Sequence, residues 1–333
     1  MIRVGIVGMG NIGKRHAEIY SKDPLSELVA VCDIDREKAD AAASRFGVKA
    51  YYVVEEMLAS EEIDLVGVCT SGVEGGSHHY EPTLQAITAG KMVLGEKPIS
   101  NDIGEAREMV AAARERGVHY GINLNHRTHA MAATARQWIK EGKLGDLLFC
   151  NMALWIRNPR DDPPYYHIRA LHPHSIDVMR YFCGGPRRVQ AFFMKAPGRA
   201  GWSTISVNFD FANGAVGHLT GSYDMPFIHP IERCEVGGTK GRFVLENVFE
   251  DLVYFPHDSP ERIHLHNSIF SQYTSFQDTF DMRIHRFLEQ VTQGDTPEEI
   301  EASGADALAV QEIIEAAIAS HEKGGVPIEL PDQ

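Results

Sequence analysis

Lys97 is the first residue of this 333-residue sequence whose position suggests chemistry. It follows a short apolar run, Met92 to Gly95, and stands in Glu96-Lys97-Pro98, where the proline restricts the turn. A lysine at the end of a strand can hydrogen-bond a substrate hydroxyl and stabilise the alkoxide that develops as the alcohol loses a hydride. The alternative is an ordinary solvated lysine.

A histidine pair forms the second chemical candidate. Leu171-His172-Pro173-His174 runs into an apolar helical pattern. Because proline is favoured at the start of a helix, Pro173 predicts a helix beginning there, with His174 in the first turn. The helix dipole disfavours an imidazolium at that end, so a neutral His174 can accept a proton from an alcohol. The alternative is a histidine that only completes hydrogen bonds at the helix end. Asp177 follows on the same face and can orient the imidazole or serve a structural role.

A glycine turn near the N-terminus predicts a cofactor site. The apolar segment Ile2 to Val7 leads into Gly8-Met9-Gly10-Asn11-Ile12-Gly13, and a helical segment follows. In such a turn Gly8 permits the tight bend, Gly10 lets the backbone approach a pyrophosphate, and Gly13 lets the helix pack on the strand. The first helical residues, Asn11 and Ile12, bring free N–H groups toward phosphates. The alternative is a purely structural connection between strand and helix.

An acidic residue at the end of the next strand favours the cofactor interpretation. The apolar run Leu28 to Cys32 ends at Asp33, 20 residues beyond Gly13. A carboxylate there can accept hydrogen bonds from the adenosine ribose. It also repels a 2′-phosphate, which favours NAD over NADP, although Arg36 is near enough to weaken that preference.

The order of elements predicts a nucleotide domain over residues 1–122 and an α+β domain over residues 123–333. The first part alternates strands and helices, as in a doubly wound parallel Rossmann sheet. The second part has the alternating pattern of a large, open, mostly antiparallel sheet. Individual expectations are helices near Glu37 to Phe46, Glu81 to Ala89, Met131 to Glu141 and two at the C-terminal end, C-cap glycines at Gly47 and Gly90, and a hairpin turn at Asn213-Gly214.

Composition narrows the class of protein. The net charge of −14 argues against nucleic acid or an anionic membrane as the main partner, and no apolar run is long enough to span a bilayer. The sequence enters a core strand directly, without the pattern of a signal peptide, and its five cysteines form no CxxC pair. These features predict a cytoplasmic protein with reduced, mostly buried thiols.

Several motifs together resemble the family of glucose–fructose oxidoreductase, inositol dehydrogenase and related sugar dehydrogenases, the Gfo/Idh/MocA family. The resemblance covers essentially the whole chain. It is carried by the glycine turn, Thr70-Ser71, His79, Glu81, Ala89-Gly90-Lys91-Met92-Val93, Glu96-Lys97-Pro98, Asn125-His126-Arg127, His174-Ser175-Ile176-Asp177 and Gly238-Thr239-Lys240-Gly241.

The resemblance implies an NAD(P)-dependent oxidoreductase that transfers hydride to or from a secondary alcohol of a sugar, cyclitol or sugar-acid-like polyol. It implies that Lys97 and His174 flank the reacting hydroxyl, with His174 as acid/base. It adds Thr70, Ser71, His79 and Glu96 to the expected cofactor contacts. A homodimer or homotetramer through the C-terminal sheet is also expected.

One position departs from the family pattern. Many members have an aspartate four residues before the histidine, where this chain has Ala170, and His172 takes the place of a glycine. His172 can replace the missing acid as a catalytic group. Alternatively, the chain uses NAD transiently as a sugar lyase or hydrolase. A further alternative, a non-catalytic NAD-sensing regulator, is disfavoured by the presence of both Lys97 and His174.

Substrate-binding candidates lie around the start of the second domain and in the stretch 155–169. Aromatic faces suit sugar rings and arginines suit carboxylates, which selects Arg127, Trp155, Tyr166 and Arg169 beside His174. The alternative is a solvated loop with aromatic anchors. His167, His172 and His174 also allow a metal hypothesis, but no nearby carboxylate completes a ligand set, so no metal is expected.

Overall fold

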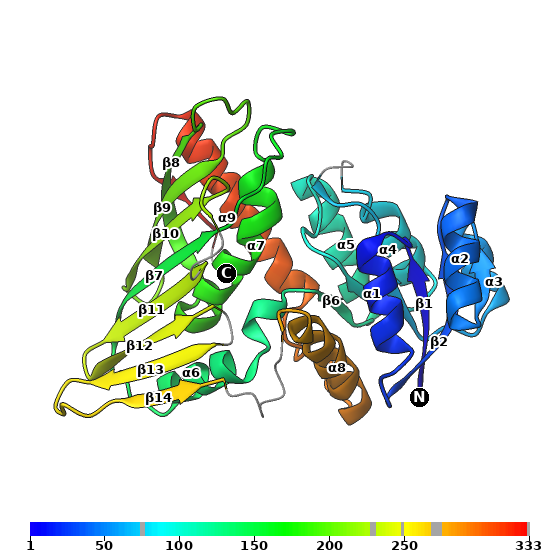
Figure 1. Cartoon of the computed structure of the whole chain (residues 1–333), viewed down its shortest axis with the longest axis horizontal. Helices are drawn as coiled ribbons and strands as arrows, with labels where there is room; N and C mark the ends of the chain where they lie inside the picture. The colour runs from blue at the N-terminus through cyan, green and yellow to red at the C-terminus, as the bar shows by residue number, and fades with distance from the viewer. Residues whose placement is uncertain (74–76, 227–230, 248–249, 268–274, 332–333) are drawn as a thin grey trace. The chain divides into compact units, whose positions relative to one another are not determined.

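The computed structural model describes residues 1–73, 77–226, 231–247, 250–267 and 275–331. The chain divides into two compact units, drawn in Figure 1. Unit 1 contains Met1–Asn123 and Phe280–Leu308, and unit 2 contains Leu124–Thr279 and Ala309–Gln333. Within the described part of the chain, no helix is both long and apolar enough to cross a membrane.

Unit 1 is built on a six-stranded parallel sheet with the order β3-β2-β1-β4-β5-β6. Its strands are β1 (Ile2–Val7), β2 (Ser26–Cys32), β3 (Lys49–Tyr51), β4 (Leu65–Val68), β5 (Met92–Gly95) and β6 (Tyr120–Ile122). Its helices include α1 (Asn11–Tyr20), α2 (Arg36–Phe46), α3 (Val54–Ser60), α4 (Tyr80–Thr88) and α5 (Ile103–Arg116). The strand order reverses between β1 and β4, and ligands of doubly wound sheets bind at such a point.

Local sequence signals predict where several of these helices end, but they do not predict two short elements. Asp35 caps α2 by accepting hydrogen bonds from the backbone of Glu37 and Lys38, and Gly47 ends the helix with φ 70°. Gly90 follows α4 with φ 72°. The predicted helices are therefore confirmed here, with Gly47 as the C-cap of α2 and Gly90 directly after the C-cap Ala89 of α4. The sequence did not indicate β3 or α3, which are only three and seven residues long.

The C-terminal segment of unit 1 departs from the expected division at residue 122. Helix α8 (Asp278–Gln293) buries Ile284, Phe287 and Leu288 in the core of the parallel sheet. On the same helix, the fully buried Arg283 donates hydrogen bonds to the carbonyls of Ile122 and Ala302. Residues 280–308 thus complete the β6 edge of unit 1 instead of belonging to unit 2.

The described residues of unit 2 contain a nine-stranded sheet with the order β14-β13-β12-β11-β7-β10-β9-β8-β15, and among these strands only β7 and β10 pair in parallel. The strands are β7 (Leu147–Trp155), β8 (Pro186–Met194), β9 (Thr204–Phe211), β10 (Val216–Ser222), β11 (Glu232–Gly238), β12 (Gly241–Glu246), β13 (Asp251–Pro256), β14 (Ile263–His266) and β15 (Ile328–Glu329). The parallel sheet and this mostly antiparallel sheet confirm the predicted fold class. The hairpin at Asn213-Gly214 is also confirmed, and a second hairpin joins β11 to β12 at Thr239-Lys240.

The helices of unit 2 cover one face of this sheet (Figure 1). They are η2 (Asn125–Arg127), α6 (Ala130–Lys140), α7 (Tyr166–Cys183) and most of α9 (Gly304–Glu322). Their apolar side chains pack with alternate strand residues, among them Cys150 and Met152 of β7 and Val207 of β9. The other face keeps Phe192, Met194 and Val216 about half exposed or more. The sheet therefore has a covered inner face and an open outer face.

Pro173 does not start a helix, so that prediction was wrong. It lies inside α7, which begins at Tyr166 and continues to Cys183. A proline within a helix removes one backbone hydrogen bond and costs about 3 kcal/mol. Residues of α7 from Ile168 to Cys183 supply much of the core beneath the sheet, which offsets that cost. His174 consequently lies in the middle of α7, and the argument from the helix dipole does not apply to it.

Candidate active site

The glycine turn of unit 1 has the geometry that a dinucleotide requires. Gly8 has φ 91°, a region that favours glycine, and a Cβ on Gly13 would lie 1.8 Å from the Gly8 carbonyl oxygen. A Cβ on Gly10 would meet no atom within 4 Å. The first and third glycines are therefore needed for the fold itself. Gly10 instead leaves open space beside the backbone, where a pyrophosphate can approach.

The N-terminus of α1 is left without a side-chain cap. Its N-cap is Gly10, and no acidic residue occupies its first turn. Helices α2 and α5 differ, because Asp35 and Asp102 accept hydrogen bonds from the first N–H groups of those helices. The backbone N–H groups of the first helical residues, Asn11 and Ile12, are thus placed to bind an anionic ligand at this end of α1.

Asp33 lies directly against the glycine turn. Its Oδ2 accepts a hydrogen bond of 2.6 Å from the Met9 N–H, and its Oδ1 accepts one of 2.9 Å from Asp35. Each carboxylate oxygen keeps a second acceptor site, so the group can still bind ribose hydroxyls. Arg36 is exposed, with its guanidinium 4.0 Å from the centre of the Tyr52 ring. This stacking gives Arg36 a partner close to Asp33.

His79 joins the ends of two strands. Its Nδ1 lies 2.7 Å from the Pro98 carbonyl oxygen and its Nε2 lies 3.2 Å from the Thr70 carbonyl oxygen. The ring is buried, and the Thr70 hydroxyl donates to the backbone of His78. Ser71 is exposed beside them. The structure therefore brings together Thr70, His79 and the turn containing Lys97, with His79 in a supporting position.

Glu96 is the fixed point of that turn. Its Oε1 accepts hydrogen bonds from Asn123 at 2.6 Å and lies 2.8 Å from His16 Nε2. Burial opposes ionisation of this carboxyl, but His16, Asn123 and the charge of Lys97 outweigh it and hold the pKa below its usual range. Because Glu96 is buried and hydrogen-bonded, it restricts the position of the backbone at the next residue, Lys97. This orients Lys97, which is half-buried at the carboxyl end of β5.

In unit 2 the two candidate histidines of α7 point in different directions. Residues two apart on a helix differ by about 200° around its axis. His172 faces β10, where a Cβ on Gly221 would lie 2.0 Å from its Nε2. Its Nε2 lies 3.0 Å from His167 Nε2 and its Nδ1 lies 3.0 Å from Ser175 Oγ. Burial, with a smaller effect from His167, lowers the His172 pKa well below its usual value. His172, which the sequence predicted as a catalytic residue, is thus fully buried against β10.

His174 instead meets residues that the sequence interpretation did not select. Its ring stacks on the ring of His126, with centroids 4.1 Å apart and planes 11° from parallel. His126 Nδ1 lies 2.9 Å and 3.2 Å from the two carboxylate oxygens of Glu232. His126 and Glu232 are both buried. His126 occurs in a motif used for the family resemblance, but no local pattern pairs it with Glu232, which is 106 residues away.

The predicted substrate-binding arginines are occupied by carboxylates. Arg127 is buried and pairs through Nε and Nη2 with both oxygens of Asp177, the Nε contact being 2.7 Å. Arg169 donates from Nη2 to both oxygens of Glu315 on α9 at 2.8 and 2.9 Å. Asp177 therefore holds Arg127 in this structure, which supports the structural alternative for that carboxylate. Both arginines tie helices of unit 2 together.

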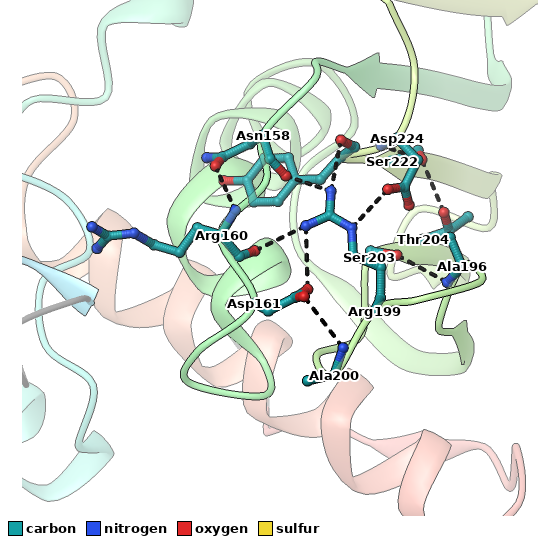
Figure 2. Close-up of polar contacts among 11 residues, drawn as sticks. Asn158, Arg160, Asp161, Ala196, Arg199, Ala200, Ser203, Thr204, Ser222 and Asp224 are labelled. Atoms are coloured by element: carbon teal, nitrogen blue, oxygen red, sulfur yellow. Dashed lines mark hydrogen bonds and ion pairs between the residues drawn. The ribbon is translucent and has the colours of Figure 1, made fainter.

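The stretch after β7 is fixed by one arginine from another loop (Figure 2). Arg199 donates to the carbonyls of Asn158 and Arg160 and pairs with Asp161 and Asp224. The segment is therefore held against the Arg199 loop and the residues that follow β10, rather than freely solvated.

The two aromatic candidates flank this segment. Tyr166 begins α7 beneath the guanidinium of Arg160, 5.3 Å from the centre of its ring. Trp155 is the last residue of β7. Because side chains alternate along a strand, it points to the same face as Asn151 and Ala153, opposite the buried Cys150 and Met152. It is thus placed on the outer face of the sheet, away from the face that α7 covers.

The histidines of α7 do not form a metal-ligand group. Among the described residues, the only group of three potential ligand atoms lying close together is Asp251, His264 and His266 on the β13–β14 hairpin. Both histidines there are exposed and hydrogen-bonded to the same carboxylate oxygen. His167, His172 and His174 therefore lack the convergence that the metal hypothesis needs.

These features define a dinucleotide-binding protein of the Rossmann class. The open Gly10 position, the uncapped helix α1 and the carboxylate of Asp33 fit the pyrophosphate and ribose of NAD.

Comparisons with known proteins agree. Residues 2–124 match the model of the oxidoreductase family with an NAD-binding Rossmann fold, and residues 132–244 match the GFO/IDH/MocA C-terminal domain. The chain belongs to the Gfo/Idh/MocA family of NAD-binding oxidoreductases.

Individual relatives extend over different parts of the chain. The inositol 2-dehydrogenase of Rhizobium meliloti is 27% identical over 332 residues, covering 96% of both chains. The D-glucoside 3-dehydrogenase of Escherichia coli is 34% identical over 148 residues, covering 44% of this chain and 41% of its own. The solved structure of levoglucosan dehydrogenase in complex with NADH has a TM-score of 0.88 with 21% identity and covers all of both chains. At that identity the structure supports the fold.

Proposed function

We propose that this protein is an NAD-dependent dehydrogenase that oxidises a secondary alcohol of a sugar, cyclitol or sugar-acid-like polyol, with NADP as a weaker cofactor. Three features near the carboxyl ends of β1 and β2 carry the proposal. They are the open space beside Gly10, the N-terminus of α1 without a side-chain cap, and the carboxylate of Asp33. The names of its relatives support the substrate class, because they act on inositol and glucosides.

Residues 1–122 would form the cofactor domain in this scheme. Gly8, Gly10 and Gly13 shape the turn, and the N–H groups at the start of α1 bind the pyrophosphate. Asp33 binds the adenosine ribose, with Arg36, Thr70, Ser71, His79 and Glu96 around the same strand ends. NAD, when bound, supplies the nicotinamide that accepts the hydride.

Lys97 and His174 would handle the reacting hydroxyl. The Lys97 ammonium hydrogen-bonds the substrate oxygen and stabilises its developing negative charge. An imidazole nitrogen of His174 takes the hydroxyl proton as the carbinol C–H hydride leaves, so the products are a ketone, the reduced cofactor and one proton. The support within the chain is that Glu96 anchors the turn of Lys97, while His126 stacks on His174.

The test is an assay of the wild-type protein with a panel of polyols, using NAD and NADP separately. The panel contains myo-inositol and the quercitols, which are deoxyinositols. It also contains D-glucose with 2-deoxy- and 3-deoxy-D-glucose, and D-gluconate. We expect the absorbance of the reduced cofactor to rise with at least one parent polyol, faster with NAD. No reduction of either cofactor by any panel member contradicts the proposal.

Ala170 favours a second candidate. Without an acid one turn before His174, the chain can oxidise a sugar transiently, eliminate or hydrolyse a substituent, and then reduce the ketone again. Conversion of a substituted sugar without net accumulation of NADH distinguishes this activity from a dehydrogenase.

The outer face of the unit 2 sheet supports self-association. Phe192, Met194 and Val216 are exposed on it, and unit 2 would then serve both substrate binding and oligomerisation. We expect a homodimer or homotetramer by light scattering, which Phe192→Glu weakens. The five cysteines are all buried and free, which supports a reducing cytoplasmic location.

A further inference from the structure

The pair formed by His126 and Glu232 is a buried polar group that the proposed reaction does not yet use. His126 belongs to η2, and Glu232 begins β11 with its side chain on the inner face of the sheet. Both side chains are about 5% exposed. Removing a carboxylate and an imidazole from water is costly unless their hydrogen-bonding groups are satisfied, so such a pair needs an explanation.

The backbone on both sides of His126 is held in place. Asn125 donates a hydrogen bond of 2.7 Å to the Thr279 hydroxyl, and Arg127 pairs with Asp177 of α7. His126 itself packs edge-on against Phe276, with ring centroids 5.6 Å apart. These contacts fix where the imidazole can lie. Binding sites require side chains whose positions are fixed by their neighbours, and the ring of His126 meets this requirement.

Only one side of the His126 ring is satisfied. The carboxylate of Glu232 lies at hydrogen-bond distance from Nδ1, which assigns the ring proton to that nitrogen. Nε2 is buried and has no hydrogen-bond partner among the described residues. In the neutral ring that Nε2 is an acceptor, and it is complemented by an O–H donor. A buried acceptor is usually paired, and a bound hydroxyl would supply the partner that the described residues do not.

The neighbour of His126 links it to the reaction. Its ring lies parallel to that of His174 with centroids 4.1 Å apart, so the two imidazoles present neighbouring edges. Hydroxyls on adjacent carbons of a sugar or cyclitol ring also lie side by side, so two stacked imidazoles can each face one of them. A hydroxyl handled by His174 would therefore bring an adjacent hydroxyl within reach of His126.

We propose that His126, oriented by Glu232, is a substrate-binding residue whose Nε2 accepts a hydrogen bond from the hydroxyl adjacent to the one being oxidised, so that the protein selects vicinal diols. This inference rests on the proposed dehydrogenase function and on the role of His174 in it. Glu232 is a positioning residue, because it acts through the imidazole of His126. Sites built to bind a hydroxyl reject analogues that lack it much more strongly than apolar pockets reject small changes.

The experiment measures the coupling between residue and substrate group. The kcat/KM of wild type, His126→Gln, His126→Phe and Glu232→Gln is determined with the panel polyols and their single-deoxy analogues. Glu235→Gln is the matched control, since Glu235 lies on the same strand but pairs with Arg242 on the outer face. His126→Phe preserves the stacked ring, and NAD affinity with thermal melting reports that each variant is folded.

We expect wild type to prefer the parent polyol over one deoxy analogue by at least about 100-fold, because the analogue leaves a buried acceptor without its partner. Both His126 variants should lose about that factor on the parent and change the deoxy analogue by less than about threefold, with Glu232→Gln showing the same pattern to a smaller degree.

Equal losses on parent and deoxy analogue would mean that His126 only supports the fold, and no loss would mean that it does not contact substrate. Either result overturns the inference while wild-type activity leaves the proposed function standing. An inactive wild type removes the proposed function itself, and the inference with it.

Discussion

Replacing Gly10 by alanine separates cofactor binding from folding more cleanly than any other change in the turn. The added methyl meets no protein atom within 4 Å, and the φ of −69° is one that alanine adopts readily. The fold should therefore lose no more than about 1 kcal/mol, the usual scale of a changed N-cap. The same methyl occupies the space through which a pyrophosphate would approach the backbone.

The expected loss of affinity follows from the contacts displaced. A hydrogen bond between a backbone N–H and a charged group contributes about 1.5–3 kcal/mol. Losing one such bond to the pyrophosphate weakens NAD binding by about 10- to 150-fold. Calorimetric titration with NAD measures this effect, and thermal melting of the same samples measures stability.

Two further glycine variants calibrate the result. Gly13→Ala places its Cβ 1.8 Å from the Gly8 carbonyl oxygen, so it should lower the melting temperature by many degrees. Gly67→Ala in β4 meets its nearest atom at 3.4 Å and should change neither property much. The reasoning is refuted if Gly10→Ala binds NAD as tightly as wild type, or if it melts as early as Gly13→Ala.

Three more predictions concern side chains. Lys97→Ala should lower kcat by about 100-fold or more in a steady-state assay, with a much smaller change in NAD affinity. Lys91→Ala, just before the opposite end of β5, should remain near wild type in the same assay. Asp33→Asn removes the charge that repels a 2′-phosphate, so the ratio of kcat/KM for NADP to that for NAD should rise at least about tenfold. Burial, with a smaller effect from the neighbouring His126, lowers the His129 pKa to about 3, so this ring takes up a proton on unfolding below pH 6.5 and stability falls as pH drops from there toward 3. His129→Asn keeps an acceptor for the helix N-cap and should reduce the slope of unfolding free energy against pH between 6 and 5 by about 1.4 kcal/mol per pH unit.

Local signals in the sequence were sufficient for the nucleotide domain. The glycine turn, Asp33 and the Gly47 cap each act over a few residues, and each is found where their spacing predicts. The hairpin turn at Asn213-Gly214, between β9 and β10, likewise lies where the sequence predicts it. Such features depend on backbone conformation near the residue itself, which the sequence specifies directly.

Features that depend on tertiary packing were not predictable in the same way. Pro173 is a sound local signal for a helix start, but burial of the remainder of α7 overrides it. Arg283 reaches β6 from α8 and draws residues 280–308 into unit 1. The pairing of His126 with Glu232 joins η2 to β11, and no local sequence pattern around either residue predicts this contact. Contacts between distant segments leave no periodic pattern to read.

The most direct test of the proposed reaction follows a labelled hydrogen. The wild-type protein is incubated with NAD and the panel polyol of highest activity, deuterated at each secondary carbinol carbon, and the reduced cofactor is analysed by NMR. A dehydrogenase transfers the label from carbon to the nicotinamide, one deuterium for each ketone formed. Accumulation of ketone with unlabelled cofactor, or consumption of the polyol with no reduced cofactor at all, would contradict hydride transfer from a secondary alcohol.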